Sequence, residues 1–135
     1  MTKLRGYIFS RTFMGERVPQ NVQNLVLRDY CLKNKYSFLL SLSEYAMTDC
    51  FAMLNDAINE SENDGIVAYS IFQMPFENIH RIKTLEKVIN RKKTIHFALE
   101  NIAITNKKDL EKINEIWMIK KNLENCILDN FLYTD

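Results

Sequence analysis

The sequence has only three glycines and two prolines among its 135 residues, and no stretch rich in serine and glycine. Such stretches are typical of flexible linkers, so their absence predicts that residues 1–135 form a single domain. The chain also lacks an apolar run of about 18 residues, which a membrane helix requires, and the apolar core of a signal peptide. We therefore predict a cytoplasmic protein that has no membrane partner.

Cysteine is scarce and follows no pattern. Cys31, Cys50 and Cys126 are odd in number and do not have CxxC or Cys/His ligand spacing, so reduced thiols and no metal site are expected. The HExxH, GxSxG, GxGxxG and P-loop motifs are missing as well. Their absence leaves zinc proteases, serine hydrolases, dinucleotide enzymes and nucleotide hydrolases without support, and we expect no cofactor.

Neither sign of charge dominates the sequence. Eighteen Lys and Arg residues stand against seventeen Asp and Glu residues, which gives a net charge of +1. A protein this close to neutral has no broad electrostatic field that attracts nucleic acid or an anionic membrane surface. We therefore expect no nucleic acid among its partners.

Short apolar segments alternate with segments of helical period. The predicted strands, rich in aromatic and β-branched residues, are residues 6–10, 36–43, 65–72 and 94–98. Nearly continuous apolar strands that are joined by helices predict a parallel sheet with both faces covered. The expected fold is three-layer α/β/α, with a mainly parallel four-stranded sheet of order about 2-1-3-4.

A long helix is predicted over residues 107–131, and it carries two apolar stripes. Leu110, Ile113 and Trp117 form the first stripe. The second stripe consists of Ile116, Ile119, Leu123, Ile127 and Phe131. One stripe can cover the sheet while the other contacts a second copy of the chain, so a homodimer through this helix is one hypothesis. A single wide core face is the alternative.

Polar and charged side chains follow the predicted strands. In an open parallel sheet, ligands bind beyond the carboxyl ends of the strands, where the strand order reverses. That point lies beside the loop after the first strand, where Arg11 and Arg17 can bind a phosphate or carboxylate through their guanidinium groups. The predicted substrate-binding residues are Ser10, Arg11, Glu16, Arg17, Gln20, Tyr45 and Gln73.

The predicted catalytic residues are Glu44, His96 and Glu100. Glu44 and Glu100 follow the second and fourth strands, and two neighbouring carboxylates drive their pKa values apart. His96 lies in an apolar strand, so its side chain is either a catalytic base or a buried, hydrogen-bonded imidazole. A plainer arrangement stays open, in which Glu16 pairs with Arg17 in solvent and Arg11 pairs with Glu44.

The order of elements, with PQNVQNLVLRDYC on the first helix, resembles the catalytic domain of serine recombinases over residues 6–104. The resemblance implies a resolvase-like sheet, and a flavodoxin-like sheet is the other form of this strand order. In the recombinases the first strand reads Tyr-x-Arg-x-Ser, with the serine as nucleophile, whereas here Ser10 comes one position early and Phe9 replaces the arginine. Their phosphate-holding Asp-Arg-x-x-Arg segment is replaced by FQMPF, so the resemblance implies the fold without strand exchange.

A second resemblance covers nearly the whole chain. The segments RGYIFSRTFMGERVPQNVQN, RDYC, SEYAM, DGIVAYSIFQMP and IHFALE resemble the sporadic carbohydrate cluster proteins, which bacterial loci for surface polysaccharide synthesis encode. This implies a role in O-antigen or capsule biosynthesis, in which the protein binds a sugar phosphate or nucleotide sugar and can act on it by acid/base chemistry. The alternative is a non-catalytic partner or ligand-sensing module for an enzyme of that pathway.

Overall fold

The computed structural model describes residues 1–133, with side chains as far as Leu123, and its centre is a five-stranded sheet of order β2-β1-β3-β4-β5. The strands are β1 (Lys3–Phe9), β2 (Ser37–Glu44), β3 (Gly65–Ala68), β4 (Thr94–Phe97) and β5 (Ile102–Ile104). The first four strands are parallel, and β5 pairs antiparallel with β4. The predicted α/β class, the mainly parallel sheet and the order 2-1-3-4 are confirmed, with one strand added.

Three elements differ from the prediction, and the first is β1, which starts at Lys3 and not at residue 6. The strand β5 is missing from the prediction, because a segment of three residues is too short to show a period. The third strand ends at Ala68 because Ser70 starts a short 3-10 helix, η1 (Ile71–Gln73). The Ser70 Oγ accepts from the Phe72 N–H at 3.2 Å, and the Gln73 Oε1 accepts from the Ser70 N–H at 3.3 Å. This reciprocal cap ends the extended backbone.

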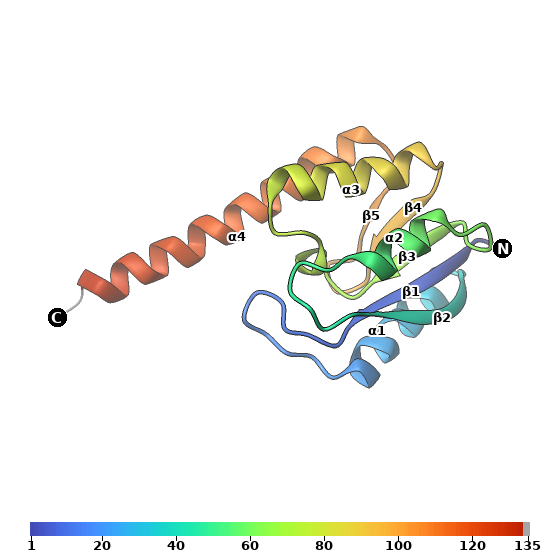
Figure 1. Cartoon of the computed structure of the whole chain (residues 1–135), viewed down its shortest axis with the longest axis horizontal. Coiled ribbons are helices and arrows are strands. Elements are labelled where there is room, and N and C mark those ends of the chain that lie inside the picture. The colour runs from blue at the N-terminus through green and yellow to red at the C-terminus, as the bar shows by residue number, and fades with distance from the viewer. Residues whose placement is uncertain (134–135) are drawn as a thin grey trace.

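Helices cover both faces of the sheet (Figure 1). One face carries α1 (Gln20–Lys33), and the other carries α2 (Ala52–Asn59), α3 (Asn78–Asn90) and α4 (Lys107–Tyr133). Successive side chains of a strand point to opposite faces. Accordingly, Ile8 packs with Leu27 of α1, while Tyr7 and Phe9 join the larger core under the other helices.

The pairing of β1 with β2 depends on a glycine. The register between the two strands shifts by one residue at Gly6, because β2 has one extra residue opposite it. This extra residue forms a β-bulge. A Cβ on Gly6 would lie 2.2 Å from the Ser41 Oγ and 3.0 Å from the Phe38 ring, so no other residue fits here without displacement. Beyond the bulge, Phe9 and Glu44 lie side by side. Both strands therefore end at the same place, the carboxyl end of the sheet.

The helix α4 extends well beyond the rest of the chain (Figure 1). Its first stripe, which includes Trp117, is buried against the sheet as predicted. In its second stripe Ile119 is 59% and Leu123 55% exposed, and Ile127 and Phe131 lie outside the described side chains. In the described part of the chain, no helix combines the length and the apolar character that crossing a membrane requires.

Candidate functional site

The segment between β1 and α1, residues 10–19, forms a small hairpin at the carboxyl end of the sheet. Phe13 and Glu16 exchange backbone hydrogen bonds of 2.9 and 3.0 Å. Met14 and Gly15 between them have φ angles of 50° and 75°, the left-handed pair that a tight hairpin turn requires. Phe13 is buried in the main core, so the hairpin is anchored to the domain.

Arg11 fixes the loop that follows β2. Its Nη1 donates to three carbonyl oxygens at 2.8, 2.9 and 2.8 Å, those of Tyr45, Met47 and Cys50. Its guanidinium carbon lies 4.3 Å from the ring centroid of Phe9 and 5.0 Å from that of Phe51. No acceptor among the described residues bonds to its Nε or Nη2. The side chain is held in place and still has donors for a ligand.

Two buried glutamines connect β1 with η1. The Gln23 Oε1 accepts from the Phe9 N–H at 2.9 Å, and its Nε2 donates to the carbonyl oxygens of Phe9 and Val18, both at 2.9 Å. The Gln73 Nε2 donates to the Gln23 Oε1 at 2.9 Å, and the Gln73 Oε1 accepts from the Tyr69 N–H at 3.0 Å. Because each buried amide is satisfied, this network stabilises the hairpin against the sheet.

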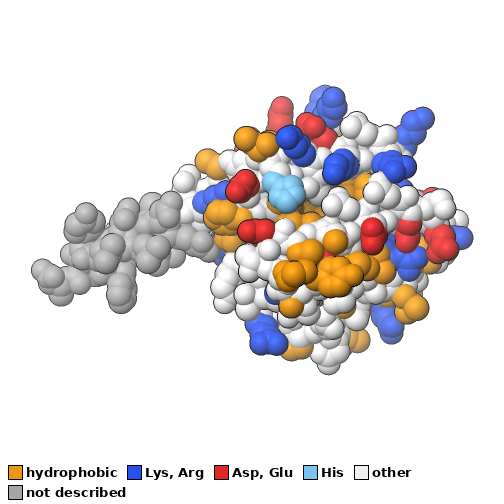
Figure 2. Space-filling model, viewed as in Figure 1, with side chains coloured by type: hydrophobic (Ala, Val, Ile, Leu, Met, Phe, Trp, Pro, Cys, Tyr) orange, Lys and Arg blue, Asp and Glu red, His pale blue; other side chains and the backbone are white. Residues whose placement is uncertain are grey.

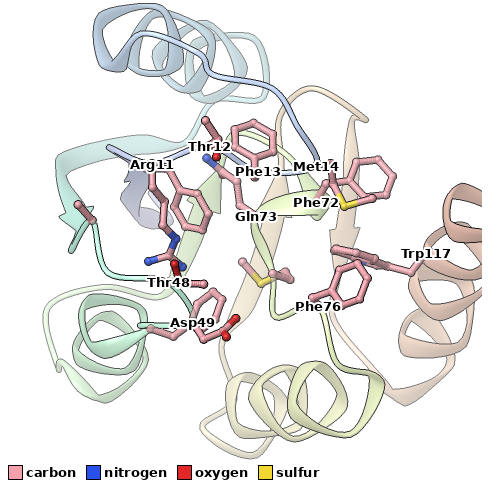
Figure 3. Close-up of a pocket in the computed structure, with 14 residues that line it drawn as sticks. Arg11, Thr12, Phe13, Met14, Thr48, Asp49, Phe72, Gln73, Phe76 and Trp117 are labelled. Atoms are coloured by element: carbon pink, nitrogen blue, oxygen red, sulfur yellow. The ribbon is translucent and has the colours of Figure 1, made fainter. Parts of the chain in front are cut away.

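A cavity of about 300 Å³, called the aromatic cavity below, opens at the carboxyl end (Figure 3). Six aromatic side chains line it: Phe9, Phe13, Phe51, Phe72, Phe76 and Trp117. Its polar side chains are Arg11, Thr12, Thr48, Asp49 and Gln73. Figure 3 shows Arg11 and Asp49 on one side, with Phe72 and Trp117 opposite them. Apolar walls with a few polar groups are typical of small-ligand sites.

Three cations contact the aromatic wall without lining the cavity. The most distant is Lys120, whose Nζ lies 5.6 Å from the Phe72 ring centroid, and the other two are Arg81 and Lys121. The buried Arg81 guanidinium lies 4.5 Å from the Trp117 ring centroid, and the Lys121 Nζ lies 4.2 Å from that of Phe76. Burial lowers the pKa of Arg81 to about 10, so it remains charged at neutral pH. All acceptors of Arg81 and Lys121 are neutral oxygens, those of Pro75, Phe76, Asn78 and Asn114. Among the described residues, neither Arg81 nor Lys121 forms an ion pair with a carboxylate.

The carboxylate of Glu44 is buried at the start of α2, outside the aromatic cavity. It accepts from the N–H groups of Met53 and Leu54 at 3.1 and 3.3 Å, which have no partner within the helix. The Tyr7 hydroxyl also donates to it, at 2.9 Å, and burial together with this carboxylate raises the pKa of Tyr7. Glu44 forms no ion pair with Arg11, so it caps a helix.

The carboxylate of Glu100 also accepts hydrogen bonds at the start of a helix, in this case η1. Its Oε2 accepts from the Ser70 hydroxyl at 2.8 Å, and its Oε1 accepts from the Ile71 N–H at 2.9 Å. The side chain borders a smaller cavity of about 200 Å³, which Met14 and Lys120 also line. Both oxygens of Glu100 therefore hold backbone structure next to the aromatic cavity without lining it.

His96 lies on the sheet face that α1 covers. Its Nδ1 is 2.8 Å from the Tyr30 hydroxyl, and its Nε2 is 2.9 Å from the Thr94 Oγ1. Burial lowers the pKa of His96 to about 4, so the imidazole is neutral at pH 7. His96 is thus not brought together with Glu44 and Glu100. In the described part of the chain, no three His, Cys, Asp or Glu side chains could hold a metal ion.

Ser10, Gln20 and Tyr45 do not line the aromatic cavity. The Ser10 Oγ donates to the Glu44 carbonyl oxygen at 3.1 Å, and the Gln20 Nε2 donates to the Ser43 Oγ at 2.6 Å. Tyr45 is exposed. Of the predicted binding residues, Arg11 and Gln73 are the two that reach the cavity wall.

Arg17 and Glu16 are exposed on the hairpin. Among the described residues there is no ion pair between them, and the Arg17 guanidinium has no partner. Figure 2 shows Lys and Arg side chains mixed with Asp and Glu side chains across one face of the molecule, in keeping with the net charge of +1. The positive charge at the carboxyl end is therefore local.

No protein-family model and no curated protein matches the chain. Solved structures do. The N-terminal catalytic domain of TP901-1 integrase aligns over 89% of this chain and 98% of its own, with a TM-score of 0.61 and 14% identity. A resolvase family site-specific recombinase from Streptococcus pneumoniae aligns over 94% and 98%, with a TM-score of 0.59 and 11% identity. The predicted resolvase-like fold is thereby confirmed.

These matches contradict the predicted function. Both proteins are recombination enzymes by name, and no match supports the carbohydrate cluster family. The prediction of surface polysaccharide biosynthesis, with a sugar phosphate or nucleotide sugar as ligand or a pathway enzyme as partner, is wrong. The exclusion of nucleic acid as a partner is also wrong, because recombinases act on nucleic acid. A net charge averages the whole surface and says nothing about one end of the sheet.

Proposed function

We propose that the chain is a nucleic-acid-binding domain with a recombinase fold, which binds DNA reversibly and does not cut it. Its 135 residues act as one α/β domain, and the DNA lies across the carboxyl end of the sheet. One observation carries the proposal: Arg11 lines the aromatic cavity and Ser10 does not. The position for phosphate is therefore next to a guanidinium and away from the serine.

Strand geometry explains why the serine is not a nucleophile in this proposal. Adjacent side chains of an extended segment point to opposite sides, so a serine one position early relative to the recombinase pattern points away from the site. Here the Ser10 hydroxyl donates a hydrogen bond to the Glu44 carbonyl oxygen. A backbone carbonyl oxygen is not basic enough to activate an alcohol as a nucleophile. The segment after Ile71 supplies Gln73 and Phe76 where the recombinase Asp-Arg-x-x-Arg pattern has its arginines.

Two arginines support the binding of phosphate. Arg11 has free donors at Nε and Nη2, and Arg17 is exposed on the neighbouring hairpin. A guanidinium group matches the geometry of phosphate oxygens and stays charged at every physiological pH. With so few cations, the affinity should be modest, and it should fall only gradually as salt is added, because the salt dependence scales with the number of phosphate contacts.

Fluorescence anisotropy with a labelled DNA of about 20 nucleotides tests the proposal. We expect Arg17→Gln to weaken binding and to lower the slope of log Kd against log salt by about one, the value for one lost phosphate contact. Lys35→Gln is the matched control, because Lys35 is exposed between α1 and β2, at the opposite end of the sheet. No binding at low salt, or equal loss in both variants, would contradict the proposal.

We also propose a cytoplasmic location, because a domain that binds DNA must be in the same compartment as the DNA. The homodimer through the second stripe of α4 stays a prediction. Ile119 and Leu123 give that stripe an exposed apolar surface in the single chain, which is what an interface between two copies would need.

A further inference from the structure

We infer that the aromatic cavity takes one unpaired nucleobase together with its phosphate, so that the domain selects single-stranded over duplex nucleic acid. The inference rests on the proposed function and adds to it the class of ligand. Three properties of the cavity support it. The walls are aromatic, the cations Arg81 and Lys121 behind these walls have no acidic partner among the described residues, and the volume suits one nucleotide.

The aromatic walls suit the face of a base. Trp117 meets Phe72 and Phe76 edge to face, with ring centroids 5.1 and 5.9 Å apart. Phe76 remains 55% exposed, although it belongs to a cavity whose other walls include buried rings. An exposed ring beside an apolar cavity indicates a binding surface. Stacking of a base on aromatic side chains is the general mode of single-strand recognition, because every base has a π face.

The charge around the cavity selects an anion. Arg11 is in one wall, and Arg81 and Lys121 stand behind the opposite one, whereas Asp49 is the one acidic residue that lines the cavity. A buried guanidinium beside neutral oxygens creates a positive potential that water screens weakly. A base that stacks on the exposed Phe76 ring would place its phosphate toward Arg11, across the cavity in Figure 3.

The volume of the cavity explains the selection for single strands. About 300 Å³ is at the lower limit of cavities that hold small molecules, which suits one nucleotide and excludes a base pair. In a duplex each base is stacked between its neighbours, so it reaches the cavity only after extrusion from the helix, which costs free energy. A single strand exposes its bases without that cost.

Trp117 makes the inference measurable, because it is the only tryptophan in the chain and it lines the cavity. We compare a single-stranded DNA of about ten nucleotides, its duplex, and an abasic strand of the same length, which keeps the phosphates and lacks the bases. We expect the normal strand to quench Trp117 fluorescence and to bind at least about tenfold more tightly than the other two.

Phe76→Ala removes the exposed ring, and Ile79→Ala is its matched control, because Ile79 is 70% exposed near the start of α3 and does not line the cavity. Phe76→Ala should weaken binding of the normal strand by about tenfold and leave binding of the abasic strand unchanged. Ile79→Ala should change neither. Both changes are at exposed positions, so the fold should be kept.

Different results separate this inference from the proposed function. Equal binding of normal and abasic strands, or an unchanged affinity in Phe76→Ala, would overturn the cavity inference and leave DNA binding at the carboxyl end intact. If no DNA binds, the proposed function fails, and deoxyadenosine monophosphate then tests the cavity alone. Quenching of Trp117 by this nucleotide, lost in Phe76→Ala, would support the cavity as a nucleotide site, and no quenching would overturn it.

Discussion

Replacement of Gln23 by leucine should destabilise the carboxyl end of the sheet. The Gln23 amide forms hydrogen bonds of 2.9 Å with the Phe9 N–H, the Phe9 carbonyl oxygen, the Val18 carbonyl oxygen and the Gln73 Nε2. Leucine has a similar volume but leaves all four groups without this partner. The two bonds to Phe9 and the one to Gln73 are buried, and each unsatisfied buried group costs about 1–3 kcal/mol. We expect the free energy of unfolding to fall by roughly 3–5 kcal/mol.

Urea denaturation followed by circular dichroism measures this change. With an m-value of about 2 kcal/mol/M, the midpoint should fall by about 2 M. Asn24→Ala is the matched control on the same helix, because Asn24 makes a single hydrogen bond of 2.6 Å, which it accepts from the Ser41 Oγ. That variant should lose about 1 kcal/mol. If Gln23→Leu loses no more than Asn24→Ala, the buried amides do not hold this end of the sheet together and the reasoning is refuted.

Three further predictions concern the fold. Gly6→Ala should lose about 1–3 kcal/mol in urea denaturation, because its Cβ would lie 2.2 Å from the Ser41 Oγ, and the double variant with Ser41→Ala should recover part of the loss. Because burial lowers the pKa of His96 to about 4, the unfolded chain takes up this proton first, so stability should fall as pH drops below about 6.5. Between about pH 7 and 5.5 the loss should be about 1 kcal/mol, absent in His96→Gln and kept in His80→Gln. Sedimentation should show a dimer that Ile119→Lys converts to monomer, and a monomeric wild type would remove the dimer.

Most of the fold could be predicted because its signals are local. Continuous apolar runs such as GIVA of β3 and the helical period of the segments between them are visible in the sequence. The strand β5 has three residues and depends on its pairing with β4, which is set by the fold. The early end of β3 had a local signal, the Ser70 to Gln73 spacing of a capping box, which sequence reasoning missed.

The candidate site was harder to predict because its parts are distant in the sequence. Arg11 and Gln73 follow their strands, so the strand order places them at the carboxyl end. Trp117 reads as a core residue of α4, and only the fold brings it next to Phe76. Glu44 also follows a strand, but the sequence does not show that its carboxylate turns to the N–H groups of α2. Gln23 was missed, although a glutamine on the buried face of a helix was a signal.

The central claim is that this recombinase fold binds DNA without forming a covalent bond to it. The most direct test mixes the full chain with labelled single-stranded DNA, measures the bound fraction by anisotropy, and then separates the same mixture on a denaturing gel. The account predicts that all bound DNA is released by the denaturant at its full length, in wild type and in Ser10→Ala alike. A labelled protein band that survives the denaturant, and that disappears in Ser10→Ala, would contradict it.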